Sequence, residues 1–140
     1  LIVYTKARRT SVKDRRAEMK YLCLVYYNEH KMLQMSQQEW DVLNRECMGC
    51  VEQLSNSGHF LDGAPLRSTA TATTLRVRDN TPIVTDGPFA ETKEQLAGFY
   101  MLDARDMNEA IRLAEKIPPA RYGCVEIRPV RELMSVDNHR

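Results

Sequence analysis

The most informative stretch of this chain runs from residue 85 to residue 94 and reads Thr85-Asp86-Gly87-Pro88-Phe89-Ala90-Glu91-Thr92-Lys93-Glu94. Asp86-Gly87 is typical of a turn, because Asp hydrogen-bonds to nearby backbone and Gly accepts a positive φ without a Cβ clash. Pro88 fixes its own φ and keeps Gly87 out of the helical region. Two interpretations are open. The stretch is either a rigid turn followed by solvated charges, or a binding or catalytic loop whose carboxylates are held by a stiff backbone.

Strand patterns lie on both sides of this stretch. Residues 71–78 are strongly β-forming, with alternate side chains on two faces. Asp79-Asn80 is a turn pair, so residues 82–85 are predicted to return as the second strand of a hairpin. Residues 98–103 are predicted to form the next strand, and Thr92 with Gln95 is predicted to cap a single helical turn before it.

Two amphipathic helices are expected elsewhere in the chain. The first begins at the capping box Ser36-Gln37-Gln38-Glu39 and ends near Gly58. Its apolar residues recur every three or four positions, at Trp40, Leu43, Cys47, Cys50, Val51 and Leu54. The second helix carries an apolar stripe from Met107 to Ile117, with a cap signal at Asp106 and a stop at Pro118.

Three more strands complete the pattern, at residues 20–27, 59–66 and 124–130, and residues 28–35 are expected to be a loop. The order strand, helix, strand, hairpin, strand, helix, strand is the α+β, ferredoxin-like split βαβ unit with an added β-hairpin. Both helices have one apolar stripe, so both should cover the same face of an antiparallel sheet. The other face is left uncovered, and a two-fold homodimer is the usual way to bury such a face.

Four short motifs stand out along the chain: Met19-Lys20-Tyr21-Leu22; Asp86-Gly87-Pro88-Phe89 followed by Glu91, Lys93 and Glu94; Gly98-Phe99-Tyr100; and Val125-Glu126-Ile127-Arg128-Pro129-Val130. Together they resemble the DGPF branch of the YCII-related family, and the resemblance covers residues 19 to 134. It implies a small α+β domain of ferredoxin-like topology that pairs into a dimeric α+β barrel. No substrate is established for that branch.

The resemblance implies two kinds of function. The wider family resembles small lyases and isomerases with a proposed His–Asp acid–base pair, and this sequence departs from it because its first helix contains no His. Relatives of the DGPF branch are often encoded beside alternative sigma factors. That association implies instead a non-catalytic ligand-binding or regulatory dimer linked to transcription.

Charge divides the chain unevenly. The 140 residues carry a net charge of +1, but residues 1–18 contain six basic and two acidic residues, so the remainder is mildly acidic. An acidic domain lacks the electrostatic footprint of a nucleic-acid-binding protein. We expect residues 1–18 to be a non-native extension or a mis-assigned start, residues 19–134 to be one domain, and residues 135–140 to be a loose tail.

No stretch has the length of a membrane span, and the apolar run at residues 1–4 is too short for a secretory signal, so we expect a cytoplasmic protein. Cys47-Met48-Gly49-Cys50 could be read as a redox or zinc motif. No second pair and no His at ligand spacing accompanies it, and both cysteines fall on the apolar helix stripe. We therefore expect buried, reduced thiols, no metal and no cofactor.

The candidate site centres on the quoted loop. We predict Asp86 and His59 as catalytic residues, and as substrate-binding residues Gly87, Pro88, Phe89, Glu91, Lys93, Arg67 and Arg128. Structural roles remain open beside these. Asp86 could cap its own turn, Glu91 and Lys93 could form a surface ion pair, and Arg128 could pair with the second subunit. The function predicted from these residues is a cofactor-independent lyase or isomerase acting on a small organic molecule, with the regulatory dimer as the alternative.

Overall fold

The computed structural model describes residues 19–133. The predicted extension at residues 1–18 and the predicted tail at residues 135–140 lie outside this range. Within it the strands and helices follow one another as β1 (Met19–Tyr27), α1 (Glu29–Met32), α2 (Gln37–Asn56), β2 (Phe60–Pro65), β3 (Thr73–Arg78), β4 (Thr81–Asp86), β5 (Gln95–Ala104), α3 (Met107–Ala114) and β6 (Gly123–Pro129). Short 3₁₀ turns lie at Thr69–Thr71 and Pro118–Tyr122.

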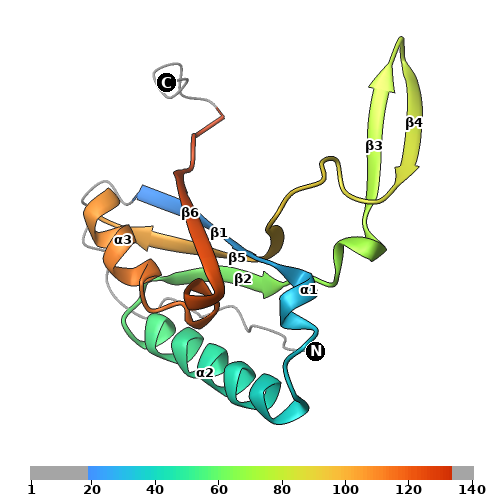
Figure 1. Ribbon diagram of the computed structural model, residues 1–140. Helices are drawn as coiled ribbons and strands as arrows, with labels where there is room; N and C mark the ends of the chain where they lie inside the picture. Colours follow the sequence, from blue (N-terminus) through green and yellow to red (C-terminus); the bar gives the residue numbers. More distant parts are fainter. Residues whose placement is uncertain (1–18, 134–140) are drawn as a thin grey trace.

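Four strands form one sheet in the order β2-β5-β1-β6, and every neighbouring pair is antiparallel (Figure 1). This order separates β1 from β2 by β5, as the split βαβ unit requires. The α+β class is therefore confirmed, and the arrangement is compatible with the ferredoxin-like fold. The dimeric barrel that the resemblance implies remains a prediction.

Both long helices cover the same face of the sheet (Figure 1). That face carries the buried side chains of β1 and β5, and these pack with residues from α2, β2 and α3 in one cluster. Its members include Tyr21, Cys23, Val25, Leu54, Phe60, Tyr100, Leu102, Ala110 and Ile117. Their burial removes apolar surface from water, which is the main force holding the sheet and the helices together.

The helix ends form as the sequence predicts. Glu39 N–H donates to Ser36 Oγ (3.2 Å), and Ser36 N–H donates to Glu39 Oε2 (2.8 Å). At the other end of α2, Gly58 has φ +78°, and the next residue donates its N–H to the carbonyl of Leu54 (2.9 Å). This is a Schellman-type ending, which favours glycine because the backbone is left-handed there.

Two local predictions are wrong. The expected loop at residues 28–35 contains helix α1, because the Asn28 side chain accepts from Lys31 N–H (3.0 Å) and Met32 is buried. The expected helical turn at Thr92 does not form. Gln95 instead begins strand β5, and its side chain donates to the Thr92 carbonyl (2.6 Å).

The predicted hairpin is present as a separate two-stranded sheet, which we call the arm (β3 and β4, residues 73–86). Asp79 and Asn80 both have positive φ, at 50° and 62°, and they join two strands that pair at Arg78 and Thr81. That is the two-residue turn whose twist suits a hairpin. The arm projects away from the rest of the molecule, on the side opposite to α2 (Figure 1).

The sheet face turned away from the helices is not covered by any described element. We call it the open face, and its central residues are Leu22, Leu24, Phe99 and Met101. Leu22 is paired with Met101, and Leu24 with Phe99, so these four side chains lie next to one another. Each is partly buried by its neighbours, and the patch as a whole is apolar.

Candidate functional site

The quoted loop is tied to the base of the arm. Gly87 has φ +97°, which explains the need for glycine at this position. Its N–H donates to the carbonyl of Ala72 (2.8 Å), and its own carbonyl accepts from Thr74 Oγ1 (2.8 Å). The turn that the Asp-Gly-Pro sequence predicts is thus anchored by hydrogen bonds to the chain just before and within β3.

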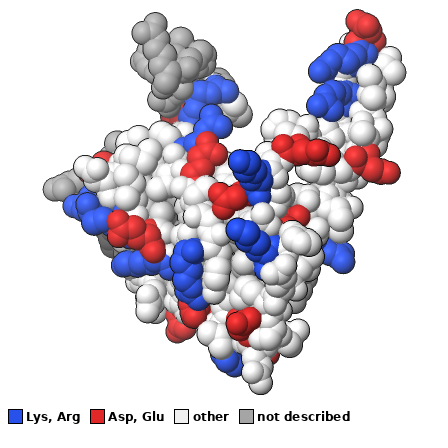
Figure 2. All heavy atoms as spheres, viewed as in Figure 1, with Lys and Arg blue, Asp and Glu red and all other residues white. Residues whose placement is uncertain are grey.

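This loop borders a hollow of about 620 Å³, which we call the loop hollow. It lies between the base of the arm, residues 66–72 and the ends of β1 and β5, and in the space-filling view a notch separates the arm from the rest of the molecule (Figure 2). Phe89 lines it, and the ring is 81% exposed because nothing else in the described chain covers it. A volume of this size is in the range of small-molecule sites.

The lining combines aromatic rings with hydroxyl groups and one guanidinium. Tyr26 and Phe89 supply the rings, and Arg67 is the cation among the lining residues. The hydroxyls belong to Ser68, Thr69, Thr71, Thr73, Thr74 and Thr92. Arg67 makes no ion pair or hydrogen bond within residues 19–133, so its guanidinium is available to an anion.

A network of hydrogen bonds holds one side of the hollow in place. The Glu29 carboxylate accepts from Thr69 N–H (2.9 Å) and from Thr69 Oγ1 (2.7 Å). Glu29 N–H donates to Gln95 Oε1 (2.9 Å), and the Asn28 amide donates to the Lys93 carbonyl (3.1 Å). Helix α1, which the sequence did not predict, therefore connects the segment after β2 to the start of β5.

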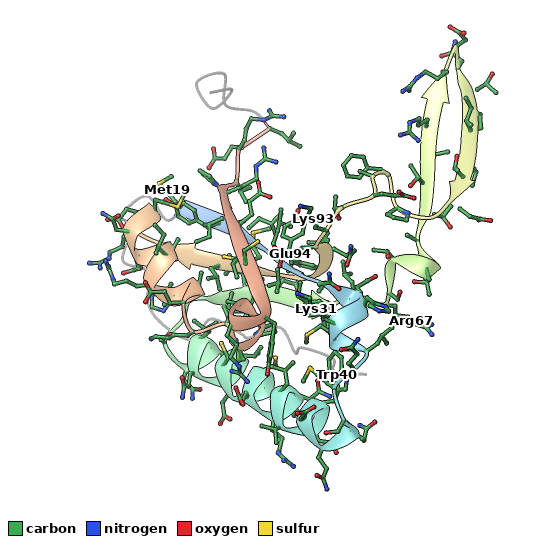
Figure 3. The ribbon with its side chains drawn as sticks, in the orientation of Figure 1. Met19, Lys31, Trp40, Arg67, Lys93 and Glu94 are labelled. Carbon is green, nitrogen blue, oxygen red and sulfur yellow. The ribbon has the colours of Figure 1, made fainter. Side chains whose placement is uncertain are left out.

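Of the loop residues proposed for binding, Pro88 and Phe89 line the hollow, and Gly87 shapes the turn that leads into it. Glu91 and Lys93 are exposed and are not part of its lining. Figure 3 shows Arg67 near the base of the arm, and Lys93 with Glu94 where the loop joins β5.

Asp86 ends strand β4, where it pairs with Thr73. Its carboxylate is exposed, accepts no hydrogen bond from residues 19–133, and is not part of the hollow's lining. The backbone N–H of Gly87 does not donate to this carboxylate, because it donates to the carbonyl of Ala72 instead. Asp86 thus lies beside the hollow with a carboxylate that has no partner among residues 19–133.

His59 lies at the end of the four-stranded sheet that is opposite to the quoted loop. Strand β2 pairs Phe60 with Leu102, near the end of β5, whereas the loop leads into the start of β5. His59 Nδ1 lies 2.8 Å from Ser57 Oγ, and its Nε2 lies 3.4 Å from Glu109 Oε1. These contacts join the end of α2 to α3, so the structure does not bring His59 and Asp86 together within one chain.

Arg128 lies on the open face, opposite Leu22, and Glu126 lies opposite Leu24 on the same face. Both point away from the helices, as the strand alternation predicts, because Val125 and Ile127 pack against the core. Tyr26 OH donates to Glu126 Oε1 (3.5 Å). Burial and the neighbouring Glu126 carboxylate raise the pKa of Tyr26, so the phenol stays protonated.

Sequence reasoning missed several residues near the hollow. Tyr26 follows Leu22 and Leu24 in the alternation of β1, so the pattern of that strand could have placed it on the open face. Residues of the segment after β2, such as Ser68 and Thr69, carry no such signal. His30 also went unassigned, and with Trp40 it lines a neighbouring hollow of about 370 Å³.

The cysteines of the Cys47-x-x-Cys50 motif are buried, as predicted, and neither forms a disulfide. Burial raises the pKa of the Cys50 thiol to about 11. Among the described residues, no three His, Cys, Asp or Glu side chains are grouped so that they could hold a metal ion. None of the described helices is long and apolar enough to cross a membrane.

Comparison with known proteins places this arrangement in a family. The sequence profile of the YCII-related domain matches residues 19–134. The chain belongs to the YCII-related family. A protein of Rhizobium meliloti (strain 1021) that is described as uncharacterised is similar to this YCII-related protein, with 36% identity over 114 residues. The match covers 80% of this chain and 92% of that relative.

Proposed function

We propose that this YCII-related protein, which we assign to the DGPF branch, binds a small organic anion in the loop hollow and does so as a homodimer. The observation that carries the proposal is the lining of that hollow, where Arg67, which has no ion-pair or hydrogen-bond partner among the described residues, and the exposed Phe89 border the same space. A guanidinium binds a carboxylate through paired hydrogen bonds, and an aromatic ring offers a flat apolar surface beside it. A small aromatic or lactone-type carboxylic acid fits this combination.

The hydroxyl groups around the hollow support the same ligand class. Threonine and serine side chains donate to or accept from carbonyl and carboxylate oxygens without adding charge. Among the described residues, the lining of the hollow contains the Arg67 guanidinium and no carboxylate, and Glu29, which accepts from Thr69, is not part of that lining. An anion is therefore favoured over a cation.

The open face supports the dimer. Leu22, Leu24, Phe99 and Met101 form a contiguous apolar patch that no described element covers. Two such faces can stack about 10 Å apart, as in other packed sheets. We expect Arg128 and Glu126 at the border of the patch to form ion pairs across the two-fold axis.

Thermal-shift measurements with a panel of small aromatic and lactone-type carboxylic acids test the ligand proposal. An acid at 100 times its dissociation constant should stabilise the native protein by about 2.7 kcal/mol. Arg67→Ala should weaken binding by roughly 10- to 100-fold, because a hydrogen bond to a charged group contributes about 1.5–3 kcal/mol.

The matched control is Arg45→Ala, which removes an exposed arginine from α2, outside the lining of the hollow. Arg45→Ala should bind like the unaltered protein. The proposal is wrong if no acid stabilises the protein, or if both arginine variants respond to the acid as the unaltered protein does.

A cofactor-independent lyase or isomerase is the second candidate. It is favoured by the free carboxylate of Asp86, which directly precedes Gly87 and accepts no hydrogen bond from the described residues. Such a carboxylate can accept a proton from a bound substrate. Asp86→Asn should then abolish turnover of an acid that still stabilises the protein, whereas equal turnover by the variant would remove Asp86 from the mechanism.

A further inference from the structure

The arm has one apolar face. Cross-strand pairing sets Leu75 opposite Val84 and Val77 opposite Pro82, and paired residues point to the same side of a hairpin. Leu75, Val77 and Val84 are 60%, 57% and 65% exposed. Four neighbouring apolar side chains therefore stand in solvent on one side of this hairpin.

The opposite face of the arm is mainly polar. It carries the pairs Thr74–Thr85, Arg76–Ile83 and Arg78–Thr81. This one-sided pattern is typical of an antiparallel sheet that is packed on one face and exposed to solvent on the other. Strands β3 and β4 nevertheless pack chiefly against each other, and an isolated two-stranded hairpin is at best marginally stable in water.

A small ligand in the loop hollow cannot bury the apolar face of the arm. The hollow's lining includes the first residues of the arm, from Thr73 to Leu75. It stops before Val77, Pro82 and Val84. Most of the apolar face lies beyond the reach of a molecule bound there, so its partner must be a macromolecular surface.

We propose that the apolar face of the arm packs against a second copy of this chain, so that each arm clasps the other subunit. This inference rests on the homodimer in the proposed function. The arm projects on the side of the sheet opposite to α2, which is the side of the open face (Figure 1). Its six-residue strands are about 20 Å long, and a sheet stacked on the open face would lie about 10 Å above it. A second subunit seated there stands beside the arm.

The area of the two surfaces fits a stable dimer only when the arms take part. From strand lengths and spacings, one arm face measures roughly 200 Å² and one open face roughly 400 Å². Stacking the open faces alone removes about 800 Å² in total from water, at the upper limit of ordinary crystal contacts. Two clasping arms, with the surfaces they cover, add a similar amount and bring the total to about 1,600 Å², the standard size of a specific interface.

Two-fold symmetry explains why one chain carries both surfaces. In a closed dimer the same patches are used twice, once by each subunit. The loop hollow lies at the base of the arm and is lined by Tyr26 and Leu96 of the main sheet as well. The second subunit therefore stands over the mouth of the hollow, and ligand binding and pairing are expected to strengthen each other.

Sedimentation velocity of the full chain over a dilution series tests the clasp. The double variant Leu75→Ser/Val84→Ser alters the apolar face, and Ile83→Ser is the matched control on the other face of the same strand. We expect the dimer dissociation constant to rise by about 100-fold or more in the double variant, because each substitution occurs twice in the interface. The control should stay within about threefold of the unaltered protein.

A photo-reactive benzoyl-phenylalanine in place of Val77 gives an independent readout. A covalent dimer after illumination supports the clasp. Cross-links within one chain, or none, overturn it, as does a double variant that pairs as tightly as the control. If the protein is a dimer but the arm takes no part in it, the clasp is refuted, whereas the open-face interface and acid binding still stand. If the protein is strictly monomeric and still binds the acid, both the clasp and the dimer are refuted, but the ligand proposal stands.

Discussion

Gly123→Ala tests the close contact between the start of β6 and the end of β1. A Cβ on residue 123 would lie 1.9 Å from the carbonyl oxygen of Tyr26 and 2.7 Å from Glu94 Oε2. The Glu94 side chain can turn away, but the carbonyl is backbone within the β1–β6 ladder. The start of β6 must therefore move by about 1 Å or more to restore ordinary contact.

We expect this variant to lose about 3 kcal/mol of unfolding free energy, at the upper end of the usual range for overpacking. Urea denaturation followed by circular dichroism measures the loss. A change of this size lowers the melting temperature by roughly 10 °C in a domain of this length.

Gly49→Ala is the matched control, because it is the same substitution in a different setting. A Cβ on Gly49 meets no atom within 4 Å, and the residue lies inside α2. Alanine favours a helix over glycine by about 1 kcal/mol, so this variant should be more stable than the unaltered protein. If Gly123→Ala unfolds within about 0.5 kcal/mol of the unaltered protein, the contact between β6 and Tyr26 is looser than the structure shows.

Three further predictions concern stability and reactivity. Burial alone would raise the pKa of Glu109, but hydrogen bonds from Arg105 outweigh it and hold that pKa below its ordinary value of about 4.3. The resulting stability is present above about pH 4.3 and is lost as the pH falls through the folded-state pKa. Glu109→Gln should therefore make the unfolding free energy, measured with urea at a series of acidic pH values, depend less on pH. Ser36→Ala should cost about 1 kcal/mol in the same assay, since it removes the capping box of α2, and an unchanged midpoint would contradict this role. Cys50, whose thiol pKa burial raises to about 11, should react with a thiol reagent at pH 8 only after unfolding, and rapid labelling of Cys50 in a native Cys124→Ser variant, which lacks the exposed cysteine, would refute its burial.

Elements whose geometry depends on a few neighbouring residues could be predicted from the sequence. The capping box at Ser36, the left-handed ending at Gly58 and the Asp79-Asn80 turn each arise from hydrogen bonds or φ preferences within about six residues. The apolar period of α2 and the alternation of β6 likewise show which side chains face the core. These local patterns, taken in order, were sufficient for the α+β class and the strand sequence.

Strand pairing over long distances decided what local patterns could not. Asp86 and His59 were both predicted to be catalytic, but the register of β2 with β5 places His59 near the end of β5, whereas Asp86 lies at the base of the arm, before the loop that leads into the start of β5. Helix α1 was missed because its four residues are too few to show a period, and burial of Met32 helps to hold it. The residues that line the hollow come from segments spread between Tyr26 and Leu96 in the sequence. Its combination of a phenyl ring, hydroxyls and a guanidinium exists only once the sheet has brought those distant segments together.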